Sequence, residues 1–128
     1  MVDNYKYSEI TEVIIKGFYN VYNKLGFGFL ENVYEKALVF ELSQLGMNCR
    51  CQCPVEVFYH SEKVGFYIAD MIVNNCVIVE IKAASVIAAE HEAQLINYLR
   101  ATEIEVGILL NFGPSASFKR KVFSSNFK

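Results

Sequence analysis

The sequence predicts a single mixed α/β domain in which a sheet lies between helices. Three stretches carry apolar residues at every third or fourth position, as helices do, and the other apolar stretches alternate or run continuously over strand lengths. The expected order is helix, helix, three strands, helix, strand and a candidate edge strand. With no internal repeat and no long linker, one domain over residues 1–128 accommodates them all.

Two helices are expected before the first strand. Residues 9–25 hold apolar side chains at a three-to-four spacing, with Ser8 as a candidate N-cap and Gly26 as the stop. Residues 30–45 repeat this spacing after a glycine-rich link. A third helix is expected from about residue 88 to residue 101.

The strands follow from a change of period. Residues 47–59 alternate, and this strand is expected to bend or break near Pro54. Residues 105–112 are apolar almost without interruption, which predicts a strand buried on both faces. Residues 118–123 are the candidate edge strand, because their basic side chains discourage pairing with another chain.

Between these strands, a hairpin carries three charges. Residues 65–70 and 76–82 are rich in β-branched and aromatic residues, yet they include Asp70, Glu80 and Lys82. A buried carboxylate is costly unless it is paired or binds a metal. Two interpretations are possible. Glu80 forms a structural ion pair with Lys82, or Asp70 and Glu80 together bind a divalent cation beside the Lys82 ammonium.

The length of the turn decides whether the two acids can meet. A two-residue turn at Asn74 and Asn75 would send Asp70 and Glu80 to opposite faces of the sheet. Their convergence requires a three-residue connection over residues 74–76, or a bulge in one strand.

Net charge and composition exclude some classes of function. The net charge of −2 argues against a protein that coats nucleic acid through charge alone, but leaves room for a bound cation and a local basic patch. Lys119, Arg120 and Lys121 are a candidate patch, with a solvated surface as the alternative. No apolar run is long enough to cross a bilayer, and residues 1–6 lack the plan of a signal peptide, so a cytoplasmic protein without a membrane segment is expected.

Four cysteines fit that expectation as free thiols. Cys49, Cys51 and Cys53 alternate along the first strand and would share one face. Reduced structural thiols are the preferred reading, and a zinc or iron–sulfur site is the alternative, although the spacing lacks a C-x-x-C pair.

The order of elements, with Asp70 on the second strand and Glu80-Ile81-Lys82 on the third, resembles the PD-(D/E)XK nuclease superfamily. Ala69 stands where the superfamily is named for a proline. The resemblance implies a restriction-endonuclease-like αβββαβ core, a mixed sheet flanked by helices, with one extra helix at the N-terminus.

A longer motif narrows the resemblance. Gly28, Glu31 and Tyr34 form G-x-x-E-x-x-Y, which resembles the small bacterial and archaeal family of GxxExxY proteins. Residues 91–99 and 109–113 extend the similarity over nearly the whole chain. Members of this family look like nucleases by motif.

The resemblance implies a Mg²⁺ (or Mn²⁺) site in which Asp70, Glu80 and the backbone carbonyl of Ile81 bind the cation. Lys82 would position water or stabilise negative charge on the phosphate. Glu31 would add an acid from the second helix; its alternative role is favourable charge at a helix N-terminus.

Gln94 and Tyr98 form Q-x-x-x-Y, similar to a motif that follows E-x-K in nuclease domains of recombination helicases. Their spacing puts both on one helix face, so Gln94 would orient Lys82 or water while Tyr98 packs or stacks on nucleic acid. Core packing is the alternative for Tyr98 and the preferred reading for Tyr34.

Two functions follow from the resemblance. The first is a Mg²⁺-dependent nuclease, a hydrolase that cleaves DNA or RNA with metal-activated water. The second is a non-catalytic adaptor of the same fold that binds nucleic acid, a protein partner or a second copy of itself.

Overall fold

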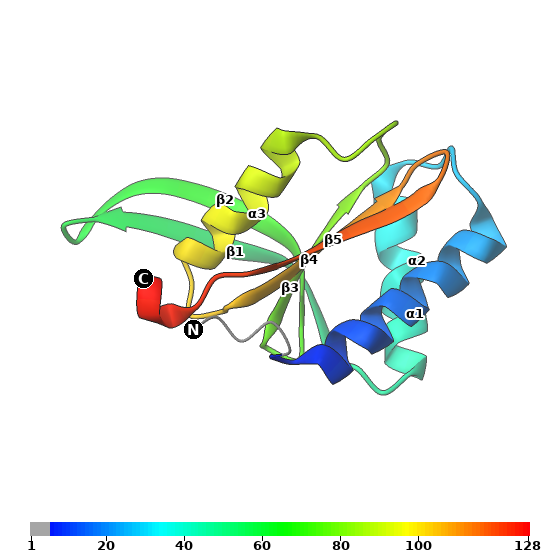
Figure 1. The fold of residues 1–128 in the computed structure, drawn as a ribbon, viewed down its shortest axis with the longest axis horizontal. Coiled ribbons are helices and arrows are strands. Elements are labelled where there is room, and N and C mark those ends of the chain that lie inside the picture. Colours follow the sequence, from blue (N-terminus) through cyan, green and yellow to red (C-terminus); the bar gives the residue numbers. More distant parts are fainter. Residues whose placement is uncertain (1–5) are drawn as a thin grey trace.

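A computed structural model describes residues 6–128, so the expectation for the first five residues lies outside it. Three helices and five strands follow one another in the expected order (Figure 1). The bounds are α1 Ser8–Leu25, α2 Glu31–Gln44, β1 Cys49–Tyr59, β2 Glu62–Val73, β3 Val77–Lys82, α3 Ala89–Arg100, β4 Val106–Phe112 and β5 Ala116–Val122, followed by a short 3₁₀ turn, Ser125–Phe127.

The five strands form one mixed sheet in the order β1-β2-β3-β4-β5. Strands β3 and β4 are parallel, because α3 carries the chain back across the sheet between them, and every other neighbouring pair is antiparallel. Helices α1 and α2 cover one face and α3 covers the other (Figure 1). The predicted fold class, a mixed sheet flanked by helices, is confirmed.

Two hydrophobic clusters hold the layers together. One packs α1 and α2 on the sheet, and the other packs α3 on the opposite face. Strand β4 is buried along its whole length, as its uninterrupted apolar sequence predicts. None of the described helices is both long and apolar enough to span a lipid bilayer.

Of two local predictions about the backbone, the Ser8 N-cap is wrong, and the break at Pro54 is absent although the backbone is irregular nearby. Helix α1 begins at Ser8 itself, and its N-cap is Tyr7, held at φ 55°; Ser8 is already inside the helix, where its carbonyl accepts a hydrogen bond from the Thr11 hydroxyl. Strand β1 runs through Pro54 without a break, because β1 is an edge strand and tolerates a missing N–H. Its irregular positions are Gln52, at φ 54°, two residues before the proline, and a register shift between Val57 and Phe58.

The three alternating cysteines do not share one side of the sheet. Cys49 packs against the α1 and α2 cluster, whereas Cys53 belongs to the α3 cluster. The left-handed backbone of Gln52 lies between them and interrupts the regular alternation of the strand. All four cysteines are free thiols, and burial, reinforced by the charge of Glu35, raises the pKa of Cys51 to about 11.

Candidate active site

The β2–β3 connection has the length that convergence of the two acids requires. Val73 pairs with Val77, so residues 74–76 form a three-residue connection. Asn74 and Asn75 take left-handed backbones, at φ 51° and 57°, and the Cys76 N–H donates to the Val73 carbonyl at 3.0 Å. Asparagine tolerates this conformation better than most residues, which explains the pair in the sequence.

Farther from this turn, β2 and β3 separate, and hydrogen bonds to carboxylate side chains replace the hydrogen bonds between the two backbones. Regular pairing ends at Met71 and Val79. The next N–H on β2, from Asp70, donates to Oε2 of Glu80 at 2.7 Å, and the N–H of Ile81 on β3 donates to Oδ2 of Asp70 at 2.8 Å. The two carboxylates therefore fill the gap between the strands, and each keeps one oxygen outside these two bonds.

Burial makes this pair electrostatically costly. Glu80 is 4 % exposed, and burial together with the charge of Asp70 raises its pKa to about 8. Burial also raises the pKa of Asp70. Lys82 opposes both shifts through its charge, yet within residues 6–128 it forms no salt bridge with either acid. A structural ion pair with Lys82 therefore does not account for the buried acids.

The G-x-x-E-x-x-Y motif builds the wall of the site next to α2. Tyr34 is fully buried, stacks on Phe112 with ring centroids 4.2 Å apart, and donates through its hydroxyl to the Gly26 carbonyl at 2.7 Å. Its hydroxyl also accepts from the Phe29 N–H at 3.2 Å, so it fixes the loop before α2. The expected packing role of Tyr34 is present in the structure.

Glu31, the first residue of α2, contacts the segment that follows β3. Its Oε2 accepts from the Ala83 N–H at 3.2 Å. Favourable charge at a helix N-terminus does not require this bond, which brings Glu31 to the end of the strand that carries Glu80 and Lys82.

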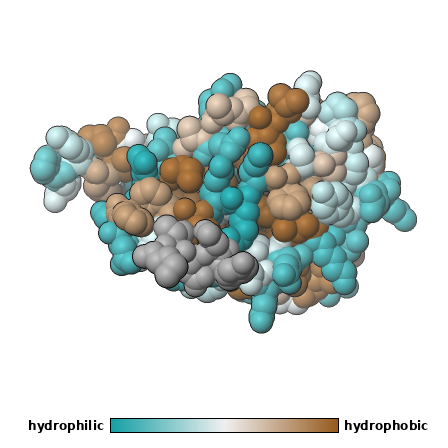
Figure 2. Space-filling view, viewed as in Figure 1, coloured by the Kyte–Doolittle hydropathy of each residue, from teal (hydrophilic) through white to brown (hydrophobic). Residues whose placement is uncertain are grey.

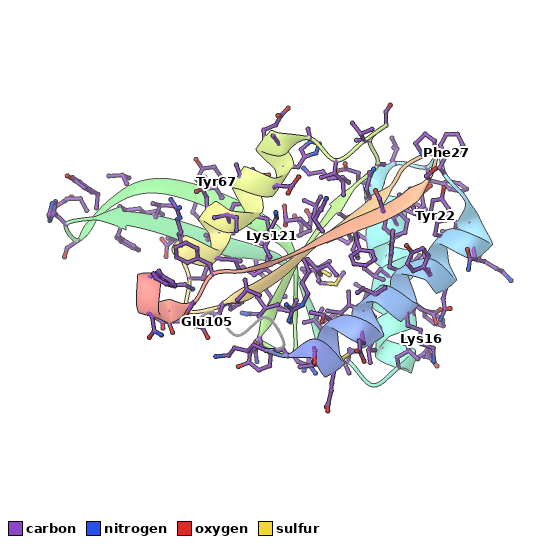
Figure 3. The ribbon with its side chains drawn as sticks, viewed as in Figure 1. Lys16, Tyr22, Phe27, Tyr67, Glu105 and Lys121 are labelled. Carbon is purple, nitrogen blue, oxygen red and sulfur yellow. The ribbon has the colours of Figure 1, made fainter. Side chains whose placement is uncertain are left out.

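The same segment is held from β4. Asn111 forms two hydrogen bonds with the backbone of Ala84, at 2.9 and 3.0 Å. A Cβ on Gly113 would lie 2.3 Å from the Ala84 carbonyl oxygen, so only glycine fits. Tyr22 of α1, labelled in Figure 3, donates to the Gly113 carbonyl at 2.7 Å. These contacts explain the asparagine and glycine that end the 109–113 motif.

We expect Gly113→Ala to destabilise the protein by about 1–3 kcal/mol, because the new methyl group must displace the backbone after β3. Chemical denaturation measures the change. Gly65→Ala is the matched control, since its Cβ would meet nothing nearer than 3.4 Å. Equal stability of the two variants would show that the Ala84 segment moves freely.

The sequence model of the PD-(D/E)XK nuclease superfamily matches residues 8–122. The chain belongs to this superfamily. A crystal structure of SSO0001 is similar in fold, with a TM-score of 0.55 and 22 % identity over 91 % of this chain. This chain covers 59 % of that protein, and the likeness concerns the fold alone. No curated protein matches the sequence.

The two residues of the Q-x-x-x-Y motif, Gln94 and Tyr98, differ in their relation to Asp70 and Glu80. Tyr98 is 4 % exposed, and burial, followed by the charges of Glu80 and Asp70, raises its pKa to about 12. Gln94 is half-buried and lines a groove on the α3 side of the sheet. Within the described residues it hydrogen-bonds to neither Lys82 nor a carboxylate, so the structure does not show the expected orienting contact.

The run of three basic residues is not one patch. On β5, Lys119 and Lys121 face α3, where Lys121 pairs with Glu92 at 2.6 Å (Lys121 is labelled in Figure 3). Arg120 points to the opposite face and donates to the Thr11 hydroxyl at 3.3 Å. Strand alternation separates the run, so a single phosphate-binding patch of all three is a wrong prediction.

Three polar residues at the site, Asn32, Glu35 and Gln52, were not predicted from the sequence. A pocket of about 290 Å³ beside the acids is lined by Glu31, Asn32, Glu35, Gln52, Asp70 and Ile81. Gln52 donates to Oε1 of Glu35 at 2.9 Å, and the charge of Glu35 contributes to the raised pKa of Asp70. Glu35 follows Glu31 by one helical turn, a spacing that could have revealed it. Gln52 carries no local signal.

The side chains present suit a hard divalent cation. In the part of the chain that the structure describes, no cluster of three or more Asp, Glu, His or Cys side chains is already arranged around a metal position. The chemistry nonetheless fits, because Asp70 and Glu80 offer carboxylate oxygens at one point. The Ile81 N–H faces β2, and in a strand the carbonyl of the same residue points to that side too.

Proposed function

We propose that this protein is a Mg²⁺- or Mn²⁺-dependent nuclease that hydrolyses phosphodiester bonds in DNA or RNA. One observation carries the proposal: the strands separate where Asp70 and Glu80 meet, the Glu80 carboxylate accepts from the Asp70 N–H, and the Asp70 carboxylate accepts from the Ile81 N–H. A protein that needed only stability would gain nothing from two buried like charges, whereas a cation ligand set requires them.

Each residue has a distinct task in this proposal. Asp70, Glu80 and the Ile81 carbonyl hold the cation, which supplies an activated water and neutralises phosphate charge when bound. Lys82, on the same face of β3 as Glu80, donates to the phosphate oxygens where negative charge develops. Glu31 fixes the segment after Lys82 and offers its second oxygen to a water.

Glu35 joins this set through Gln52. The amide of Gln52 holds one oxygen of Glu35, and Glu35 lines the pocket that Asp70 and Glu31 also line. Glu35 is therefore placed to support a water or cation next to Asp70. Membership of the GxxExxY group and a cytoplasmic location remain predictions from the sequence.

We expect purified wild-type protein to cleave some nucleic acid in Mg²⁺ or Mn²⁺, and Glu80→Gln to lose at least a hundredfold in rate, because the amide cannot carry the charge that binds the cation. The amide oxygen can still accept from the Asp70 N–H, which preserves the fold. Cleavage is measured on single-stranded, double-stranded and branched DNA and RNA, with a chelator as control.

Equal rates for wild type and Glu80→Gln would rule out this site as the origin of any activity. Folded protein that binds nucleic acid or a partner without cleavage across the panel would favour the adaptor function instead.

A further inference from the structure

A groove of about 670 Å³ lies between α3 and the hairpin of β1 and β2, which extends beyond the rest of the sheet (Figure 1). Its volume is within the ~300–1,000 Å³ typical of small-molecule sites. Tyr67 enters it from β2, against α3, as Figure 3 shows. Val57 and Phe58 belong to the hairpin side of its lining, and Gln94, Asn97 and Tyr98 belong to the α3 side.

This groove lies along β2, the strand that also carries Asp70. Tyr98 lines the groove, and it also lies near enough to Glu80 and Asp70 for their charges to raise its pKa. Tyr67 precedes Asp70 by three residues on β2, a distance of about 10 Å along an extended strand. A ligand stacked on Tyr67 would therefore lie within about 10 Å of Asp70 along the strand.

The aromatic and amide side chains of the groove suit a flat heterocycle. Tyr67 is 49 % exposed, and its ring lies 5.9 Å from that of Tyr98 at an angle of 49°, which leaves surface for stacking. Gln94 and Asn97 present both donors and acceptors from one face of α3, as recognition of a base edge requires.

The charges of the groove favour a base over a phosphate. Glu56 and Glu90 line it together with Arg100, and Glu56 is already paired with Lys63 at 2.9 Å. The remaining charges balance, so the groove has no excess of positive charge to hold phosphate. The wider surface of the hairpin is also apolar, with exposed side chains at Val64, Phe66, Tyr67 and Ile68, and part of this surface is brown in Figure 2.

We propose that this groove binds an unpaired nucleobase next to the scissile phosphate, so that the substrate is single-stranded or locally unpaired DNA or RNA. This inference rests on the proposed nuclease function for its position relative to cleavage. A duplex keeps its bases stacked and paired, and must release one before Tyr67 can stack on it.

The test compares Tyr67→Ala with Tyr67→Phe in the Glu80→Gln background, where bound strands survive. We expect Tyr67→Ala to weaken binding of single-stranded oligonucleotides about tenfold, since it removes one stacking platform, and to leave duplex binding unchanged. Tyr67→Phe keeps the ring and should bind as tightly as the parent. Fluorescence anisotropy with DNA and RNA strands and their duplexes distinguishes the two nucleic acids.

Tyr59→Ala is the matched control, because Tyr59 is exposed on the same hairpin but does not line the groove. Unchanged strand binding by Tyr67→Ala, or equal losses for strands and duplexes, would overturn the groove assignment. So would a protein dimer that Tyr67→Ala disrupts without any effect on strand binding. If the wild type cleaves nucleic acid but binding does not depend on Tyr67, only the groove assignment is refuted. If binding depends on Tyr67 but no cleavage occurs, only the proposed hydrolysis is refuted.

Discussion

Lys82→Met is expected to lower the rate of cleavage by about a thousandfold while the protein still binds its divalent cation. Lys82 shares a face of β3 with Glu80, and its charge acts on both acids without forming a salt bridge to either. Its ammonium is therefore available to a substrate. Removing one aligned donor from developing negative charge typically costs about 10²–10³ in rate.

Single-turnover cleavage and calorimetric titration with Mn²⁺ measure the two properties separately. Lys16→Met is the matched control, because Lys16 (labelled in Figure 3) is exposed on α1, a helix that contributes no residue to the pocket beside the acids. Lys82→Arg should retain part of the activity, since it keeps the charge but changes the donor geometry. Loss of cation binding in Lys82→Met would instead assign this lysine to the support of the ligands.

Much of the fold could be predicted from the sequence, because the relevant signals are local. Helical and alternating periods placed every helix and strand within a few residues of its position. The sequence alone did not determine the register of the β2–β3 hairpin. It predicted only that residues 74–76 must all lie in the turn if Asp70 and Glu80 are to meet. The structure meets that condition, and two left-handed asparagines make it possible.

The parts that sequence analysis missed depend on contacts between distant segments. Gln52 sits opposite Asp70 because β1 pairs with β2, and it reaches Glu35 because α2 packs on that side of the sheet. Neither contact has a local pattern. Similarly, Gln94 faces a groove because the β1–β2 hairpin extends beneath α3, a tertiary arrangement that helix periodicity does not reveal.

For the basic residues on β5, in contrast, a local pattern was sufficient. Alternation along a strand already requires Arg120 to point away from Lys119 and Lys121, so the separation of these three side chains could be predicted from the sequence. The same alternation failed for Cys49 and Cys53, where a single left-handed residue intervenes. The alternation of side chains along a strand is therefore predictive only as far as the first residue with an irregular backbone. In β1 this residue is Gln52, which lies beside the candidate active site.

In the absence of metal, the protein is expected to become less stable as the pH rises from about 5 to about 8. Folded Glu80 has a pKa of about 8, against 4.5 for an ordinary glutamate, so in this window the folded state keeps a proton that the unfolded state releases. For this one group, each unit of rising pH then lowers the free energy of unfolding by about 1.4 kcal/mol at most. The raised pKa of Asp70 acts in the same direction.

Thermal denaturation in a chelator across this pH range measures the effect. Glu80→Gln should remove most of the slope, because it has no proton to lose. Glu105 does not interfere, since hydrogen bonds from Lys6 and Ser125 lower its pKa to about 2 and its stabilising effect is lost only at more acidic pH. Identical slopes for wild type and Glu80→Gln would mean that Glu80 is ionised in the folded protein.

Adding Mn²⁺ should oppose this loss of stability, because ligand binding favours the ionised carboxylates of the folded state. At a hundredfold excess over its dissociation constant, a cation that binds only folded protein adds about 3 kcal/mol of stability. The gain is expected to be larger at pH 8 than at pH 5.5, where protons compete for Glu80, and to disappear in Asp70→Asn. A gain that is equal at both pH values, or that survives in Asp70→Asn, would place the cation elsewhere on the protein.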